Sequence, residues 1–298
     1  MQPASLEELV LRSKKNKPKR LIVVAADDLH VLSSVKKAVH ENIIVPVLIG
    51  NSEKIFNLAK KLNFEVDNFE IINIPDTIEA SKYAVNLIKE NKAEILMKGM
   101  VPTAILMKEV LNKKHGIHHS GLLSHYTILE LKTFHKLLSI SDVALNISPG
   151  LDEKKIIIHN SLNVMQKLGY TNPKIAILCP IEIVNPKIES TVHADVLKKM
   201  WLNNEITDCI IDGPLALDNA ISKEAASIKK IPGTVAGDAD LLIVPDLNSG
   251  NILYKSLCYL AEATSAAIIT GGIVPIVLTS RTDSERSKYY SIALAACM

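Results

Sequence analysis

The stretch GDADLLIVPDLNSGNILYKSL, residues 237–257, shows most directly how this chain folds. Its apolar run DLLIV predicts a buried strand, the following PDLNSG predicts a turn, and the residues from about Gly250 onward predict a helix. Either Asn248 or Ser249 could cap that helix. A continuous apolar strand that is followed closely by a helix is typical of a parallel sheet covered by helices on both faces.

The same stretch also allows an anion site. A helix that begins after a glycine-containing turn presents unpaired backbone N–H groups, and Lys255 would add a positive charge one turn later. An ordinary strand-to-helix loop is the favoured explanation of the pattern, so the turn alone does not assign a function.

Strand-like runs alternate with helical periodicity along most of the chain. They predict strands at 20–26, 43–49, 69–74, 94–98, 174–179, 207–211, 240–244 and 266–269, and a helix at 191–203. Between the two series, over residues 122–147, strand-like runs such as VALNI follow one another too closely to leave room for helices, which places a domain junction there. We therefore predict an α/β protein of two three-layer α/β/α domains with mostly parallel sheets. The first domain comprises residues 1–130 and 272–298, and the second comprises residues 131–271.

Composition restricts the classes of function. The 34 Lys and Arg residues against 32 Asp and Glu residues give a formal charge of +2, too small for a nucleic-acid coat or a membrane-binding stripe. The longest apolar stretch, 266–278, is broken by glycine and proline and is too short to span a bilayer. The four cysteines form no C-x-x-C pair, as expected of reduced thiols. We expect a soluble, cytoplasmic protein that binds neither nucleic acid nor membrane.

The C-terminal stretch GGIVPIVLTSRTDSERSKYYSIALAA, residues 271–296, predicts a strand that leads into a helix. Thr282 and Glu285 have the spacing of a capping box, and Asp283 would favour the helix dipole. Ser280 and Arg281 are not needed for capping. They fall at the C-terminal edge of a strand, where open α/β sheets bind ligands.

The stretch EILMKGMVPT, residues 94–103, predicts a strand that ends at Lys98 and Gly99, with a helix beginning near Pro102. A lysine in this place can contact a phosphate group, and a solvated lysine beside a turn glycine explains the pattern equally well.

Two further features bear on metal binding and nucleophilic catalysis. His115, His118, His119 and His125 crowd one segment, but their spacing matches no zinc motif and carboxylates are not close by. We predict no metal and expect a histidine-rich loop near an anion site. Cys179, at a strand end, is the one cysteine to consider as a nucleophile, and a buried thiol is the favoured explanation.

Together these segments resemble the phosphate acetyl/butyryltransferase family, most closely its butyryltransferase branch. The resemblance covers residues 98–296 in register, and the first ninety residues are similar only in their alternation of strands and helices. The matching segments are MKGMVPT, VLNKKHGI, LLSH, VNPK, DGPLALDNAIS, VAGDADLLIVPDLNSGNILYKSL and PIVLTSRTDSERSKYYSIALAA.

The resemblance implies an isocitrate/isopropylmalate dehydrogenase-like fold, with the active site in an interdomain cleft and a homodimer formed through the second domain. It implies direct transfer of a short acyl group, butyryl or branched-chain, between coenzyme A and inorganic phosphate. Coenzyme A is then a substrate, and no cofactor is tightly bound.

The resemblance also assigns site residues. The catalytic Ser-Arg pair falls on Ser280 and Arg281, and Asp283 is the nearest carboxylate base because Ser287 stands where the acetyltransferase branch has its base. His118 stands where related butyryltransferases tend to carry an arginine. The residues that would bind phosphate or coenzyme A are Lys98, Gly99, Thr103, His118, Ser124, Asn248, Gly250, Asn251 and Lys255.

Other functions stay open at this point. The family resemblance includes phosphate acetyltransferase as an alternative. A nicotinamide- and metal-dependent decarboxylating dehydrogenase would share the implied fold, but the sequence lacks a clustered set of Asp ligands. The residues at Ser287 and His118 also suggest a catalytically weakened protein that binds coenzyme A or acyl phosphate.

Overall fold

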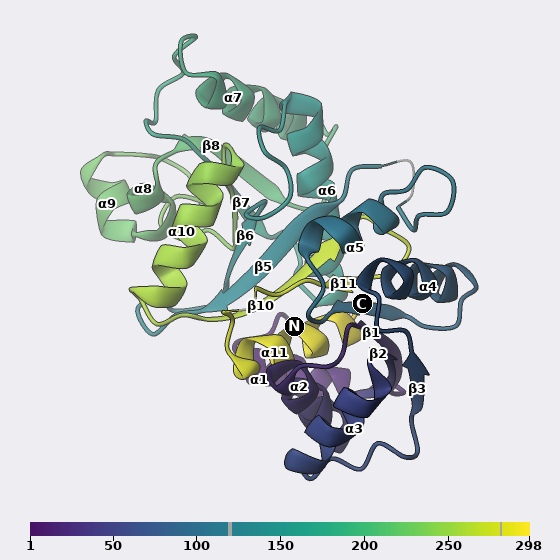
Figure 1. Cartoon of the computed structure of the whole chain (residues 1–298). Coiled ribbons are helices and arrows are strands. Elements are labelled where there is room, and N and C mark those ends of the chain that lie inside the picture. The colour runs from purple at the N-terminus through teal and green to yellow at the C-terminus, as the bar shows by residue number, and fades with distance from the viewer. Residues whose placement is uncertain (119–120, 281) are drawn as a thin grey trace. The chain divides into compact units, whose positions relative to one another are not determined.

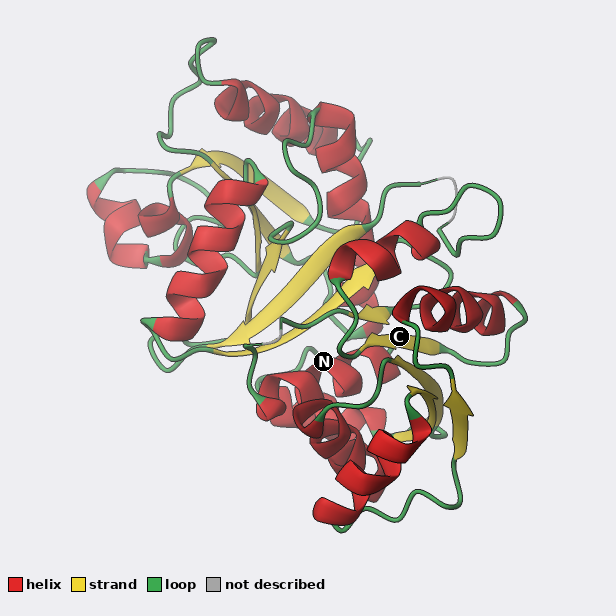
Figure 2. Ribbon diagram, in the orientation of Figure 1, coloured by secondary structure: helices red, strands yellow, loops and turns green. Residues whose placement is uncertain are grey.

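The computed structural model of the chain describes residues 1–118, 121–280 and 282–298 (Figure 1). The chain divides into two compact units. We call residues 7–121 with 266–298 the terminal unit, and residues 1–6 with 122–265 the central unit. Within each unit the strands are mostly parallel and helices lie on both faces of them, so the predicted fold class is confirmed (Figure 2).

The strands of the terminal unit lie in the order β3–β2–β1–β4–β11–β10. Their bounds are β1 (Lys19–Val24), β2 (Ile44–Gly50), β3 (Glu70–Asn73), β4 (Ile95–Lys98), β10 (Thr264–Thr270) and β11 (Ile276–Val277). Strands β3, β2, β1, β4 and β11 run parallel, and β10 is antiparallel to β11. β11 lies beside β4, with Val277 opposite Met97. The C-terminal ends of β4 and β11 therefore meet at one edge of the sheet.

In the described part of the chain, six helices belong largely to this unit and cover its strands. The helices assigned largely to the terminal unit are α1 (Leu6–Ser13), α2 (Leu29–His40), α3 (Ser52–Lys61), α4 (Thr77–Lys89), α5 (Thr103–Val110) and α11 (Glu285–Ala296). α11 packs on α2 and α4 packs on α5. Residues 287–296 of α11 are all buried, so the last helix packs into the core built by the N-terminal part of the chain.

The start of α11 differs from the predicted capping box at Thr282 and Glu285. The capping residue is Ser284, whose side chain accepts a hydrogen bond from the backbone N–H of Ser287. Asp283 instead accepts a hydrogen bond from the Ser280 N–H. That bond closes a turn over residues 280–283, which keeps Thr282 outside the helix.

The strands of the central unit lie in the order β5–β6–β9–β7–β8. Their bounds are β5 (Ser124–Glu130), β6 (Leu138–Ser141), β7 (Lys174–Leu178), β8 (Ile210–Leu215) and β9 (Leu241–Ile243). β5 is antiparallel to β6, and the others run parallel. α6 (Leu151–Lys167) and α7 (Glu189–Leu202) cover one face, while α8 (Leu217–Ile221), α9 (Lys223–Ile228) and α10 (Leu247–Tyr259) cover the other (Figure 1).

Three local predictions for the central unit are wrong. Residues 143–147 form no strand, because the Asp142 carboxylate accepts the N–H groups of Ala144 and Leu145 and turns the chain. The strand predicted at 207–211 lies at Ile210–Leu215 instead. α10 begins at Leu247 rather than near Gly250, because the Asp246 side chain caps it by accepting the Ser249 N–H.

None of the helices in the described part of the chain is long and apolar enough to cross a membrane.

Candidate active site

A cavity of about 120 Å³ lies in the terminal unit at the edge where β4 and β11 end. Two segments that are distant in the sequence line it together, Lys98 with Gly99 after β4 and Thr279 with Ser280 after β11. His30 of α2 and Lys288 of α11 also line it. Adjacent parallel strands end at the same sheet edge, which is why residues predicted separately from two motifs share one cavity.

Lys98 is a buried cation rather than a solvated one. Its side chain is 5% exposed, and its Nζ donates hydrogen bonds to the carbonyl oxygens of Gly99 and Val101, each at 3.2 Å. The explanation of Lys98 as a solvated surface lysine is therefore excluded. The ammonium group lies on the lining of the cavity, where a phosphate group is a suitable partner.

Gly99 is required by a close approach of two backbones. A Cβ at this position would lie 2.2 Å from the carbonyl oxygen of Ala25 and 2.6 Å from that of Val24. The Gly99 N–H donates to the same Val24 oxygen at 2.8 Å. A side chain at position 99 would push the strand-to-helix loop away from β1, and Lys98 would move with it.

Ser280 lies in the turn that Asp283 closes. The Ser280 N–H donates to Asp283 Oδ2 at 2.6 Å, and Ser280 Oγ lies 3.0 Å from Thr282 Oγ1. Arg281, the other half of the predicted catalytic pair, lies outside the described residues. Asp283 Oδ1 accepts no hydrogen bond from a described residue.

Lys288 donates hydrogen bonds to the backbone of this turn. It is not among the site residues that the sequence predicted. Its side chain is 3% exposed, and Nζ donates to the carbonyl oxygens of Ser280 at 3.2 Å and of Asp283 at 2.5 Å. Burial lowers the pKa of Lys288, and the nearby Asp283 carboxylate acts in the opposite direction. A charged residue directly beside the apolar positions of the predicted C-terminal helix was the signal that could have pointed to it.

Glu285, the next carboxylate along the chain after Asp283, contacts two side chains of α2. Its carboxylate contacts His30 Nδ1 at 3.0 Å and accepts a hydrogen bond from Ser33 Oγ at 2.9 Å. The hydrogen bond to His30 is the main reason that the pKa of Glu285 lies below its ordinary value. A carboxylate with a lowered pKa is a weaker base.

The remaining predicted residues of the terminal unit do not line the cavity. Thr103 is exposed at the first position of α5, whose preceding residue, Pro102, provides no side-chain cap. In the first turn of α5, the N–H groups of Ile105 and Leu106 donate to the Pro102 carbonyl oxygen. His118 pairs with Gly272 in an isolated bridge, and its Nδ1 lies 3.3 Å from the carbonyl oxygen of Val110.

The predicted residues of the central unit fall into two groups. Ser124 and Gly250 are buried: Ser124 Oγ accepts from Asn160 Nδ2 at 3.1 Å, and a Cβ at Gly250 would lie 2.7 Å from the Asp142 carbonyl oxygen. Gly250 thus permits close packing of α10 on the end of β6. The other group comprises the exposed Asn248 and Lys255, and Asn251, whose Nδ2 donates to the Val143 carbonyl oxygen at 3.2 Å.

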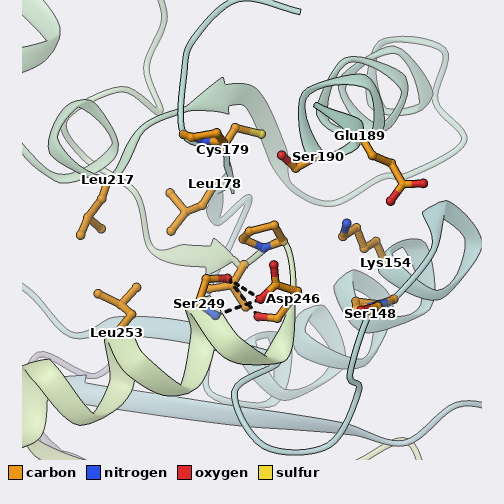
Figure 3. A pocket seen from close by; sticks show the side chains of 14 residues that line it. Ser148, Lys154, Leu178, Cys179, Glu189, Ser190, Leu217, Asp246, Ser249 and Leu253 are labelled. Carbon is orange, nitrogen blue, oxygen red and sulfur yellow. Dashed lines mark hydrogen bonds between the residues drawn. The ribbon is translucent and has the colours of Figure 1, made fainter. Parts of the chain in front are cut away.

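A larger pocket, of about 590 Å³, lies in the central unit beyond the ends of β7 and β9 (Figure 3). Lys154, Cys179 and Asp246 line it, and none of these was predicted as a binding residue. Burial raises the pKa of the Cys179 thiol to about 11, so the thiol is protonated near neutral pH. Cys179 is therefore a buried thiol and not an activated nucleophile.

Metal ligation has no candidate cluster in residues 1–118, 121–280 and 282–298, where no group of three or more His, Cys, Asp or Glu side chains is placed to hold an ion.

Comparison with known proteins points to one family. The model of the family described as Phosphate acetyl/butaryl transferase matches residues 5–84 and 75–296. Phosphate butyryltransferase from Clostridium acetobutylicum is 41% identical over 98% of this chain and 97% of its own length. Phosphate acetyltransferase from Thermotoga maritima is 43% identical over 98% of both chains. The crystal structure of a branched-chain phosphotransacylase from Enterococcus faecalis superposes with a TM-score of 0.84 at 33% identity, covering 94% of this chain and 98% of the other.

Proposed function

The chain belongs to the phosphate acetyl/butaryl transferase family, and from this premise we propose that it transfers a short acyl group between coenzyme A and inorganic phosphate. Butyryl or a branched-chain acyl group is the proposed substrate, and acetyl is the alternative, because relatives of all three kinds match nearly the whole chain. The observation that carries the site assignment is the shared cavity of Lys98 and Ser280 at the ends of two adjacent parallel strands.

The proposed reaction is direct. An oxygen of phosphate attacks the thioester carbonyl of acyl-CoA, the new C–O bond forms, the C–S bond breaks, and coenzyme A leaves as a thiolate that takes up a proton. Negative charge builds on the carbonyl oxygen in the transition state. A fixed hydroxyl and a fixed cation at that point lower the barrier by a few kcal/mol. We assign these roles to Ser280 and Arg281.

Asp283 is the proposed base for the reverse direction, in which the coenzyme A thiol must lose a proton. Its Oδ2 accepts the Ser280 N–H, and its Oδ1 accepts no hydrogen bond from a described residue, so we assign to this carboxylate both the shaping of the turn and the uptake of a proton. Glu285 is less suitable because His30 and Ser33 already occupy it.

Within each unit, certain residues are proposed to contact phosphate or coenzyme A. In the terminal unit these are Lys98, Gly99, Thr103 and His118, with Lys98 supplying the buried charge. In the central unit they are Ser124 and the α10 residues Asn248, Gly250, Asn251 and Lys255. Gly250 would act by letting α10 pack closely rather than by touching a ligand.

We also propose a cytoplasmic homodimer. The four cysteines are free thiols, as suits a reducing compartment. Large apolar side chains are exposed on helices of the central unit, among them Leu202, Ile228 and Tyr259. Light scattering after size exclusion tests the dimer, and a monomer at micromolar concentration would contradict it.

A thiol-release assay tests the function. Acetyl-, propionyl-, butyryl- and isobutyryl-CoA are each supplied with and without phosphate, and we expect phosphate-dependent release that is fastest with butyryl or isobutyryl. Release without phosphate, or none with any of the four, would contradict acyl transfer. Arg281→Lys keeps the charge but loses the two-pronged guanidinium, so near-normal rates in this variant would remove Arg281 from the mechanism.

A further inference from the structure

Lys154, in the first turn of α6, is a buried cation that lines the larger pocket. Its side chain is 3% exposed, and Nζ has one hydrogen-bond partner among the described residues, His193 Nδ1 at 3.1 Å. No ion pair formed within the described part of the chain includes Lys154. Burial lowers the pKa of both side chains, and a ring nitrogen that accepts a lysine N–H belongs to a neutral histidine. A buried charge of this kind is unfavourable unless a further partner is supplied.

Asp246 lines the same pocket and carries a negative charge. Its Oδ1 caps α10 by accepting from Ser249 N at 2.9 Å and Ser249 Oγ at 3.1 Å. Its Oδ2 accepts no hydrogen bond from a described residue, and the carboxylate is turned toward the space that Lys154 also faces (Figure 3). Glu189 reaches the pocket too, but its side chain is 85% exposed and solvated.

The rest of the lining is largely apolar. Leu178 is the last residue of β7, and Val244 follows β9. Leu217 and Leu253 project from α8 and α10 (Figure 3). Leu178 and Val244 are buried in the protein, and their surfaces line the pocket. The volume of about 590 Å³ is that of a small-molecule site. The pocket thus combines a cation, an anion and an aliphatic wall.

We propose that this pocket binds an aliphatic α-amino acid. The carboxylate of the ligand accepts hydrogen bonds from Lys154 Nζ, its ammonium group donates to Asp246 Oδ2, and its side chain packs on Leu178, Leu217 and Leu253. A zwitterion gives each charge its partner, whereas a plain carboxylate leaves Asp246 unpaired and a plain amine leaves Lys154 unpaired. The site is additional to the substrates of acyl transfer, and its lining residues all belong to the central unit.

Isothermal titration of the full-length protein tests the proposal. The probes are L-alanine, L-valine, L-leucine and L-phenylalanine, with 4-methylpentanoate, which lacks the amine, and 3-methylbutylamine, which lacks the carboxylate. We expect saturable binding of L-leucine or L-valine, and affinity weaker by about tenfold or more for each truncated analogue, because each loses one charged pair. No saturable binding of any amino acid, or equal affinity for 4-methylpentanoate and L-leucine, would overturn it.

Two variants assign the contacts. Lys154→Met removes the cation and keeps an apolar stem, and Asp246→Asn removes the anion while asparagine still caps α10. Lys154→Met should weaken binding of L-leucine about tenfold and leave the binding of 3-methylbutylamine unchanged. Asp246→Asn should also weaken binding of L-leucine about tenfold, and it should leave the binding of 4-methylpentanoate unchanged. Lys155→Met is the matched control, since Lys155 lies next on α6 and its Nζ faces Glu205 at 3.9 Å outside the pocket.

Competition separates this site from the acyl-CoA site. Saturating coenzyme A should leave the affinity for L-leucine unchanged. If coenzyme A displaces L-leucine, and Lys154→Met weakens coenzyme A binding, the pocket belongs to the acyl donor and the proposed amino acid site is wrong.

Discussion

Replacing Lys288 with methionine should slow the proposed acyl transfer by loosening the turn that carries Ser280. Methionine keeps the buried apolar stem of the side chain but removes the N–H donors to the carbonyl oxygens of Ser280 and Asp283. A hydrogen bond from a charged donor contributes about 1.5–3 kcal/mol, so two such bonds contribute about 3–6 kcal/mol before the unfavourable burial of the ammonium is subtracted. If the net effect raises the activation free energy of acyl transfer by about 2 kcal/mol, kcat falls about thirtyfold.

The measurement is thiol release from butyryl-CoA with saturating phosphate, alongside urea unfolding of the same samples. Lys37→Met is the matched control, because Lys37 also contacts α11, with Nζ 4.0 Å from the centre of the Tyr289 ring, but does not touch the turn. We expect kcat to fall in Lys288→Met and to stay near the wild-type value in Lys37→Met. A Lys288→Met enzyme within twofold of wild-type kcat, with unchanged stability, would refute the positioning role.

The alkaline limb of the rate profile gives a second readout. Burial lowers the pKa of Lys288 relative to an exposed lysine, so its ammonium loses a proton at a lower pH in the folded protein than in the unfolded chain. The two hydrogen bonds weaken as the pH rises through the folded-state pKa. Wild-type kcat should therefore fall on the alkaline side, and this fall should be absent from Lys288→Met.

Three other changes test separate parts of the structure. Gly99→Ala brings a Cβ to 2.2 Å from the Ala25 carbonyl oxygen and should lower the free energy of unfolding by about 3 kcal/mol, measured by urea titration, with a loss below about 1 kcal/mol speaking against the close approach. Asp283→Asn keeps an acceptor for the Ser280 N–H but cannot take up a proton. In the coenzyme A-consuming direction, kcat/KM should therefore drop about a hundredfold, and its decrease at acidic pH should disappear. An unchanged pH profile would place the base elsewhere. Burial acts to raise the pKa of Asp238, but the hydrogen bond from Lys174, with others, outweighs it, and the pKa lies well below the ordinary value. The stability that Asp238 contributes is then present above the unfolded pKa of about 3.9 and lost as the pH falls below it, so the gap in unfolding free energy between wild type and Asp238→Asn should be constant from about pH 5 to 8 and shrink toward about pH 3.

Local sequence patterns determine much of this protein. The apolar runs at β1, β2, β4 and β7 identify strands because a strand buried on both faces is apolar along nearly its whole length. The alternation of these runs with amphipathic helices is enough to predict an α/β/α fold. Family membership could also be read from ordered motifs. Helix starts are less predictable. The pattern favours Thr282 as the cap of α11, and the structure has Ser284. For α10 it favours Asn248 or Ser249, and the structure has Asp246. Several Ser, Thr, Asp and Asn side chains compete at such a turn, and the path of the chain decides among them.

Tertiary structure alone decides which distant residues meet. Lys98 and Ser280 line one cavity because β11 inserts beside β4, an order of strands that no local pattern contains. The same holds for Lys288 beneath the turn and for Lys154 and Asp246 around the larger pocket. A strand or a cap depends on interactions within a few residues, whereas the partners of a buried charge depend on which elements the sheet places side by side.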